Sequence, residues 1–323
     1  MKKSTLTPVL VAVLLAAFTA CKKDKTDRTG SVRSAKEFTE QLGSKKQTVS
    51  INASALPQTV TLAGGTKITF PAGSLTKNGS PVSGTVTVEA YEMLKRSQVL
   101  LSGTNTNHIS GAPLESHGFI YIDVKANGSS VDNELAVPVK ISIPANGKPY
   151  TNIWQGVQND AQQMVWQNPP QNANGQGGQR DVKGDVTTDS FIFDFGNLGW
   201  INTDVFYSYS NPKTTVRVEL QNNPGALATF RGFSGETFVY FCAKGSNVAA
   251  QLYTPDGPNK VKSYDDVMPV GVEGKFISFA IKDGHYYLAQ KEATITANMS
   301  ETLSLSETTQ DAIQTAINAL DGY

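Results

Sequence analysis

The stretch Gly84-Thr-Val-Thr-Val-Glu-Ala90 places small apolar side chains at every second position, with polar ones between them. This period of two is the pattern of a β-strand with one buried face. The pattern recurs on both sides of the stretch, at 60–62, 67–70, 119–124 and 137–143. Turn-forming pairs such as Gly64-Gly65 and Asn78-Gly79 separate the runs. Short strands at this spacing, with no helical period between them, predict an antiparallel β-sandwich over 51–147.

A second series of strand patterns begins near residue 190, with runs at 191–195, 215–220, 237–243, 275–281 and 293–297. These runs predict a second antiparallel β-sandwich over 190–323, of transthyretin-like or immunoglobulin-like type. Near the end of the chain, Ile313, Ile317 and Leu320 are spaced four and three residues apart. This spacing predicts one short amphipathic C-terminal helix over 306–320, packed on the second sandwich. The predicted fold class is therefore all-β, with two sandwiches and a C-terminal helix.

Residues 148–189 separate the two predicted sandwiches. Trp154 and Trp166 lie on either side of an Asn-Asp pair, which indicates a β-hairpin with one Trp on each strand. The run 167–179 is rich in Gln, Asn and Gly and poor in apolar residues. Such a composition is typical of a loop or linker.

The N-terminal sequence has the pattern of an export signal. Lys2 and Lys3 precede an apolar run over 8–18, and Thr19-Ala20-Cys21 follows it. A basic start, an apolar middle and small residues before the cut are the features of a signal peptide over 1–20. The apolar run has 11 residues, whereas a helix that spans a bilayer needs about 20. The alternative is an ordinary secretory signal peptide with an incidental cysteine.

Cys21, directly after the cut, resembles the lipobox of bacterial lipoproteins. The resemblance implies that the Cys21 thiol receives a diacylglyceryl group, with a fatty acid such as palmitate, and becomes the first residue of the mature protein. It also implies an outer-membrane lipoprotein on the periplasmic side or the cell surface. Residues 21–50 are polar and poor in apolar positions, so we expect a flexible tether that carries the lipidated Cys21, with a short helix over 35–42 as the alternative for part of it.

Charge and cysteine content limit the partners. Removal of residues 1–20 removes two lysines and no acid, which leaves 26 basic and 28 acidic residues, a net charge near −2. Such a chain has no basic field to attract nucleic acid, so we expect no nucleic-acid partner. If Cys21 carries a lipid, Cys242 has no partner for an intramolecular disulfide. Cys242 lies in an apolar strand pattern, so we expect a buried, unreactive thiol.

Two sequence resemblances bear on the fold and the function. The runs 65–75 (with Phe70-Pro71-Ala72-Gly73), 84–89 and 113–119 together resemble the ZU5-like β-sandwich over about 57–146. The resemblance implies a protein-interaction module. Some related proteins cut their own chain at His-Phe-Ser, but His117-Gly118-Phe119 is followed by no hydroxyl nucleophile, so we expect no self-cleavage. The run Gly199-Trp-Ile-Asn-Thr-Asp204 resembles a motif of Gram-negative surface lipoproteins, with Thr203 where that motif has Cys.

The familiar catalytic and cofactor motifs are absent from the sequence. It contains no HExxH, CxxC, GxSxG, GxGxxG or Walker motif, so we expect no cofactor, no metal and no enzymatic activity. Three weaker hypotheses stay open: a metal site from His108, His117 and Glu115, a Ca²⁺ site from Asp123, Asp132 and Glu134, and a glycosidase-like carboxylate pair from among Asp194, Asp204, Glu219 and Glu236. Solvated charges and hydrogen-bonded histidines are the commoner explanation of such residues.

Aromatic residues give the best indication of a binding surface. Many large rings lie in the second half of a weakly charged chain, and exposed rings stack on sugars or anchor proteins, although most rings in a small sandwich belong to the core. The candidates for ligand binding are Trp200, Tyr207, Tyr209 and Tyr286. Tyr207 and Tyr209 have the same strand parity, so a continuous strand would place both on one face.

We therefore expect a membrane-anchored surface lipoprotein that acts as a non-enzymatic binding module, in adhesion or in a surface assembly. The alternative is a carbohydrate-binding lipoprotein that captures glycans for uptake. The arrangement of the rings separates the two hypotheses. A row of two or three exposed aromatic residues favours a glycan, and a contiguous apolar patch of several hundred Å² favours a protein partner.

Overall fold

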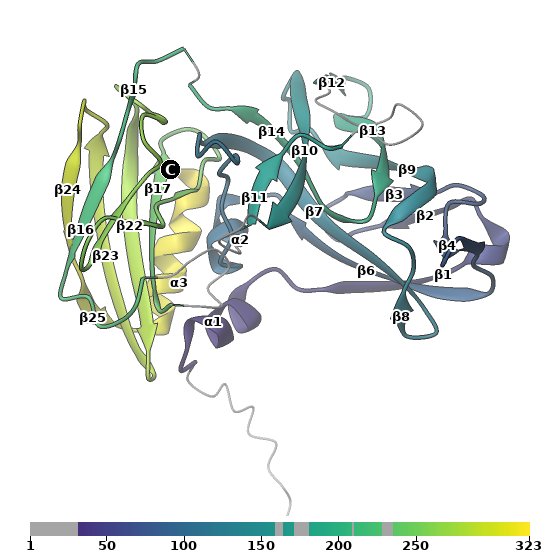
Figure 1. The fold of residues 1–323 in the computed structure, drawn as a ribbon, viewed down its shortest axis with the longest axis horizontal. Helices are drawn as coiled ribbons and strands as arrows, with labels where there is room; N and C mark the ends of the chain where they lie inside the picture. The colour runs from purple at the N-terminus through teal and green to yellow at the C-terminus, as the bar shows by residue number, and fades with distance from the viewer. Residues whose placement is uncertain (1–31, 159–163, 171–180, 209, 228–234) are drawn as a thin grey trace, which may run out of the picture. The chain divides into compact units, whose positions relative to one another are not determined.

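Antiparallel β-strands make up most of the structure (Figure 1). The computed structural model describes residues 32–158, 164–170, 181–208, 210–227 and 235–323. The largest sheet has the strand order β1-β6-β7-β14-β10-β12-β13-β9-β3-β2, with β8 paired to β7 and β11 to β10. Its strands are β1 (Gln47–Asn52), β2 (Gln58–Thr61), β3 (Lys67–Phe70), β6 (Thr85–Met93), β7 (Leu114–Ala126), β8 (Ser129–Ser130), β9 (Glu134–Pro144), β10 (Tyr150–Gln158), β11 (Met164–Gln167), β12 (Asp181–Asp185), β13 (Ser190–Asn197) and β14 (Gly199–Phe206).

The two halves of this first sheet enclose one apolar core. Val86 and Val88 of β6 and Ile122 of β7 are buried in the same cluster as Ile141 of β9 and Phe193 of β13. Alternate residues of β6 and β7 therefore point inward, as the period of two predicts. The sequence prediction of a sandwich in this region is confirmed.

A second sandwich is built from two smaller sheets. Val218 of β16, Phe241 of β17 and Leu303 of β24 share the core between them. Pairing is antiparallel except between β16 and β24, which run parallel. The four-stranded sheet contains β19 (Thr254–Pro255), β20 (Lys260–Lys262), β16 (Arg217–Gln221) and β24 (Ser300–Ser304), and the five-stranded sheet contains β18 (Ala250–Gln251), β17 (Thr237–Ala243), β22 (Glu273–Lys282), β23 (His285–Thr294) and β25 (Ser306–Thr308). Two short ladders complete the strands: β4 (Thr76–Lys77) with β5 (Ser80–Pro81), and β15 (Lys213–Thr214) with β21 (Met268–Pro269).

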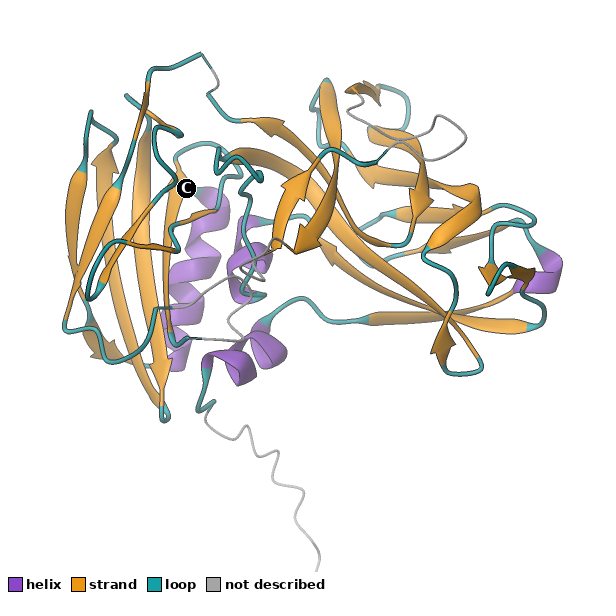
Figure 2. Ribbon diagram, viewed as in Figure 1, coloured by secondary structure: helices purple, strands orange, loops and turns teal. Residues whose placement is uncertain are grey.

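Helices cover the second face of the five-stranded sheet (Figure 2). They are α1 (Ala35–Leu42), α2 (Arg96–Leu101) and α3 (Gln310–Asn318), which a 3-10 turn at Ala319–Gly322 follows. A further 3-10 turn, Ala53–Ala55, lies between β1 and β2 of the first sheet. Phe238 and Tyr240 of β17 pack against this helical layer, while Val239 and Phe241 face the sandwich core. Every residue of β17 is buried, because apolar material covers both of its faces.

The helical layer also joins the two β regions. Its apolar cluster contains Phe38 of α1, Leu100 of α2 and Ile317 of α3, together with Phe119 of β7 and Trp166 of β11 from the first sheet. Phe119 belongs to the outer face of the first sheet, because its neighbour Ile120 points into the core. The outer face of the first sheet is therefore buried where it meets the helices.

The predicted tether over 21–50 departs from the structure in its second half. Residues 21–31 lie outside the described residues. From Val32 onward the chain is packed: Phe38 is fully buried, and the Tyr286 hydroxyl donates a hydrogen bond to the Val32 carbonyl. The charged positions of α1 face solvent, which is why this stretch has the composition of a tether.

The predicted start of the second sandwich, near residue 190, also disagrees with the strand pairing. Strand β13 pairs with β9 and β14 pairs with β7, so 190–206 belong to the first sheet and not to the second sandwich. The predicted hairpin is present as β10 and β11, whose register places Gly156 opposite Trp166, and its turn lies outside the described residues. Within 148–189, the described strands β10, β11 and β12 all belong to the first sheet.

The predicted C-terminal helix is confirmed, with a later start. Ser306–Thr308 form β25, and α3 begins after Thr309. Ile313, Ile317 and Leu320 are all fully buried, as their spacing requires. Among the described residues, no helix has both the length and the apolar character needed to cross a bilayer.

Replacement of Thr309 by Ala is expected to lower the free energy of unfolding by about 1 kcal/mol. The Thr309 side chain accepts a hydrogen bond from the Ala312 amide at 3.2 Å and so caps α3. Urea denaturation of both proteins measures the difference. The variant Thr309→Ser retains the capping oxygen and should stay close to the parent, so equal losses in the two variants would contradict a capping role.

The Cys242 prediction is confirmed. Its side chain is fully buried, and burial raises the pKa of the thiol to about 12. A thiol in that state has almost no thiolate at neutral pH, and the thiolate is the reactive form.

Candidate functional site

Three aromatic side chains form a row across adjacent strands of the first sheet. Tyr91 of β6 is opposite Tyr121 of β7, and Tyr121 is opposite Trp200 of β14. All three point away from the core, because Ala90, Ile122 and Ile201 take the inward positions. We call these three residues the aromatic row.

The rings of the aromatic row are in mutual contact. The Tyr121 and Trp200 centroids are 5.1 Å apart, those of Tyr91 and Tyr121 6.0 Å, and those of Tyr91 and Trp200 6.4 Å, with the last pair within 22° of parallel. Trp200 also contacts the buried Phe119 at 6.1 Å. One end of the aromatic row therefore packs against the buried helical layer, while all three residues stay partly exposed. Anchoring on one side restricts ring motion, which lowers the entropy cost of binding.

Two hollows border the aromatic row. One, of about 350 Å³, is lined by Tyr91 and Trp200 together with Met93 and the segment that follows α1. The other, of about 320 Å³, is lined by all three rings and by charged residues. Lys46, Tyr91 and Trp200 line both hollows, so a ligand can contact the rings from two sides.

A ladder of charged side chains continues the same sheet face. The Glu89 carboxylate lies 2.8 Å from Lys125 Nζ and 3.1 Å from Lys46 Nζ, and Lys125 Nζ lies 3.9 Å from Asp123. The hydrogen bond from Lys125, and then that from Lys46, hold the pKa of Glu89 below its usual value. We call Lys46, Glu89, Asp123 and Lys125 the charge ladder. Its formal charges sum to zero.

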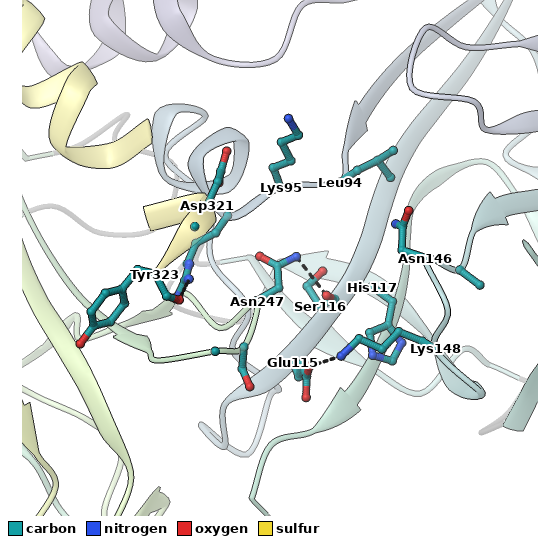
Figure 3. Close-up of a pocket in the computed structure, with 15 residues that line it drawn as sticks. Leu94, Lys95, Glu115, Ser116, His117, Asn146, Lys148, Asn247, Asp321 and Tyr323 are labelled. Atoms are coloured by element: carbon teal, nitrogen blue, oxygen red, sulfur yellow. Dashed lines mark hydrogen bonds and ion pairs between the residues drawn. The ribbon is translucent and has the colours of Figure 1, made fainter. Parts of the chain in front are cut away.

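A separate open cleft of about 520 Å³ lies where β7, α2 and the chain after β17 meet (Figure 3). Lys148 Nζ lies 2.7 Å from the Glu115 carboxylate across its floor, and the Asn247 side chain donates to the Ser116 carbonyl at 3.0 Å. The charged groups on this floor are thus paired with each other.

The opposite wall of the cleft is held by Arg96. Its guanidinium is buried and donates to the carbonyls of Ala243, Leu320 and Tyr323, at 2.7, 2.5 and 2.9 Å. The neighbouring Asp321 carboxylate accepts from the amide and hydroxyl of Ser97. These polar groups connect α2 to β17 and to the residues that follow α3, so their hydrogen bonds stabilise the fold.

His117 lies at the base of the cleft. Its ring stacks on Phe191, with centroids 5.6 Å apart and planes 17° from parallel. Burial lowers the pKa of the His117 imidazole to about 4, so the ring is neutral at physiological pH. Nδ1 of His117 is buried without a hydrogen-bond partner among the described residues. A neutral imidazole stacked on Phe191 serves the packing of this region.

The buried carboxyl of Asp204 lies next to His117 and gives a structural role to part of the run 199–204. Asp204 is fully buried; it accepts from the His117 amide at 3.2 Å and from the Asn202 side chain at 2.6 Å. The register of β14 against β7 shifts between Asn202 and Asp204, and Thr203 Oγ1 donates to the Gly118 carbonyl at 2.6 Å. In this run, Trp200 joins the aromatic row, Ile201 enters the core, and Asn202 with Asp204 stabilises the bulge.

The site residues predicted from the sequence lie in different parts of the structure and do not form one site. Trp200 belongs to the aromatic row. Tyr286 is 8% exposed and its hydroxyl is bonded to Val32 and Gln310, so it is part of the packing around α1. Tyr207 packs against the second sandwich core, and Tyr209 lies outside the described residues, as does Cys21. The parity argument for Tyr207 does not apply, because β14 ends at Phe206 and Ser208 has a φ of 45°.

The residues proposed for a metal site, a Ca²⁺ site or a carboxylate pair have separate surroundings in the structure. Across the described ranges, no three His, Cys, Asp or Glu side chains lie close enough to hold a metal ion. His108 packs edge-on against Trp154 and Phe206, at 5.0 Å each. Asp132 accepts from Asn78 and Gly79 amides and so closes a turn, while Asp123 belongs to the charge ladder. Of the carboxylates weighed as a pair, Asp204 is enclosed, whereas Glu219 pairs with Lys260 on the second sandwich.

Tyr91 and Tyr121 are the functional candidates that sequence reasoning missed. Tyr121 lies at an outward position of the predicted run 119–124, and Tyr91 directly follows the predicted run 84–90, after the inward-pointing Ala90. The period of two could therefore have predicted that both side chains point outward. Their adjacency to Trp200 was not, since β14 follows β7 by more than 70 residues and pairs with it only in the folded sheet.

Comparison with known proteins gives no match for this chain: no family model, no curated protein and no solved structure is significantly similar to it. The fold belongs to the β-sandwich type, with mostly antiparallel sheets.

Proposed function

We propose that this protein is a lipid-anchored, non-enzymatic binding module of the bacterial outer membrane, and that the aromatic row is its binding face. The observation that carries the proposal is the in-register alignment of Tyr91, Tyr121 and Trp200 on an outward sheet face, with a hollow on each side. Partly exposed Tyr and Trp rings held by a rigid sheet are the anchors that binding surfaces use most often.

The chemistry of the face supports binding. The rings offer apolar area with a polar edge, and the charge ladder offers hydrogen-bond donors and acceptors beside them. Specific sites commonly combine an apolar surface with a small number of placed polar groups. Sites on strands hold their geometry better than sites on loops, and all three rings lie on long strands.

The ZU5-like resemblance forms part of the proposal. It is supported by a sandwich over the predicted region and by the corner at Pro71-Ala-Gly73, where Gly73 takes a φ of 76°. Leu75, two residues later, returns to the core. ZU5 domains serve mainly in protein interaction, which agrees with a binding role for this chain.

Replacement of Cys21 by Ala is expected to move the protein from the membrane fraction to the soluble fraction. Two or three acyl chains hold a protein stably at a bilayer, and this variant cannot receive any. Cell fractionation with labelled palmitate measures both location and acylation. The control is Cys242→Ala, which should remain membrane-bound and labelled. Retention of the unlabelled Cys21→Ala protein in the membrane would contradict the lipid anchor.

Replacement of Trp200 or Tyr91 by Ala is expected to weaken binding to isolated cell envelopes by about tenfold or more, since truncation of a residue that anchors an interface typically costs about 2 kcal/mol or more. The assay uses fluorescently labelled protein that begins after Cys21. Tyr150→Ala is the matched control, because Tyr150 is 53% exposed and lies outside the aromatic row. Circular dichroism confirms folding of each variant. Equal binding by the parent and both row variants would contradict this binding face.

A further inference from the structure

We infer that the aromatic row and the charge ladder bind a neutral glycan chain. The inference rests on the proposed function and adds the chemical class of the ligand. It follows from the charge of the face, from the surfaces that the rings and polar groups present, and from the position of the exposed apolar residues.

The charge of the face favours an uncharged ligand. Lys46 and Lys125 are balanced by Glu89 and Asp123, and the ion pairs join them at 2.8 to 3.9 Å. A polyanion needs an excess of cations to offset its own repulsion and desolvation, and a polycation needs an excess of acids. A neutral ligand can use each of these groups as a hydrogen-bond partner without a net electrostatic cost.

The surfaces match those of a sugar ring. One side of a pyranose presents C–H groups with slight positive charge, while the face of an aromatic ring is negative. Stacking therefore places the C–H side on Tyr91, Tyr121 or Trp200. The hydroxyls at the rim of the sugar then reach the carboxylates and ammonium groups of the charge ladder, and hydrogen bonds to ionised groups are among the stronger ones.

The two hollows favour a chain over a single sugar. Both share Tyr91, Trp200 and Lys46, so they meet at the rings and extend from them in different directions. The first reaches Thr39 and Ser102, which supply hydroxyl groups, whereas the Ser44 hydroxyl is buried. An extended ligand that crosses the rings has polar partners at both ends.

A protein partner fits this face less well. The five large hydrophobic side chains exposed in the described part of the chain lie on other elements and none borders the aromatic row: Ile109, Val137, Tyr150, Val186 and Ile192. Protein interfaces deplete charged residues from their centres, yet the charge ladder is adjacent to the rings. A glycan tolerates charged hydrogen-bond partners beside a stacking platform.

Native electrophoresis through gels that contain a soluble polysaccharide tests the inference. The neutral probes are galactomannan, mixed-linkage β-glucan, xyloglucan and pullulan, and the anionic probe is polygalacturonate. The protein that begins after Cys21 should be retarded by at least one neutral probe, equally at low and high salt. Trp200→Ala and Tyr91→Ala should weaken the affinity by about tenfold or more, and Tyr150→Ala should not change it.

The outcomes separate the ligand class from the binding function. Retardation by polygalacturonate alone, lost at high salt, would overturn the neutral glycan. Envelope binding that depends on Trp200 but disappears after protease treatment, without retardation by any neutral probe, would also overturn it and would leave the binding module with a protein partner. Absence of binding both to envelopes and to every polysaccharide would overturn the ligand class and the proposed function together.

Discussion

Replacement of Phe38 by Ala is expected to lower the free energy of unfolding by about 3–5 kcal/mol. The Phe38 ring is fully buried, packs at 5.8 Å from Phe279, and shares one apolar cluster with α2, α3 and the five-stranded sheet. The substitution removes this contact area and leaves a cavity in close-packed surroundings, and both effects destabilise the fold.

Urea denaturation of Phe38→Ala and of the parent measures this effect. Glu40→Ala on the same helix is the control; its carboxylate is 60% exposed and its pair with Lys36 is an exposed one at 3.8 Å, so a change within about 0.5 kcal/mol is expected. A loss below 1 kcal/mol in Phe38→Ala would show that α1 contributes little to the stability of the fold, although residues 47–50 would still belong to β1 of the first sheet.

Raising the pH from 6.5 to 8 is expected to lower the stability of the parent protein by about 2 kcal/mol through Asp204 alone. Burial raises the pKa of this carboxyl to about 8 in the folded protein, from 3.8 when unfolded. The folded state therefore holds one proton more than the unfolded state between these values, and stability falls as pH rises through the folded pKa. Well below the folded pKa each pH unit changes the free energy by about 1.4 kcal/mol, and at pH 8 the slope is about half of that.

His117 acts with the opposite sign at lower pH. Its folded pKa of about 4 lies below the unfolded value of 6.5, so the unfolded state binds the extra proton between the two values and stability rises with pH there. The two groups offset each other between about pH 4 and 6.5. Above that range, the Asp204 effect remains.

The variant Asp204→Asn should lose this fall in stability, because an amide does not titrate. Urea denaturation at pH 6.5 and at pH 8 compares the variant with the parent, and the difference between their slopes isolates Asp204 from other groups. Asp283→Asn, at an exposed turn position with a φ of 53°, is the matched control and should keep the parental slope. An unchanged slope in Asp204→Asn would show that the carboxyl is ionised when buried.

Much of the local structure followed from the sequence. The alternation at 84–90 identified β6 and its inward face, since side chains of a strand point to opposite sides in turn. The spacing of Ile313 and Ile317 identified α3, and the apolar surroundings of Cys242 predicted its burial. Each of these predictions depends only on neighbouring residues within one strand or helix, so the local sequence is enough to make it.

The candidate site was predicted only in part. Trp200 was named from its ring and its motif, while Tyr91 and Tyr121 were missed, and Tyr286 was named although it is buried against α1. Ring chemistry alone cannot separate an exposed aromatic residue from a buried one. That distinction depends on which strand and which helix lie beside it.

The sequence by itself determined many of the strands and their inward faces, several turns and the C-terminal helix, because hydrophobic period and turn chemistry act over a few neighbouring residues. Only the tertiary structure decided that 190–206 join the first sheet, that α1 packs on Phe279, and that Tyr91, Tyr121 and Trp200 form one row. Strand pairing and burial bring together residues far apart along the chain. Many registers satisfy the same local pattern, and the packing of the whole fold selects one.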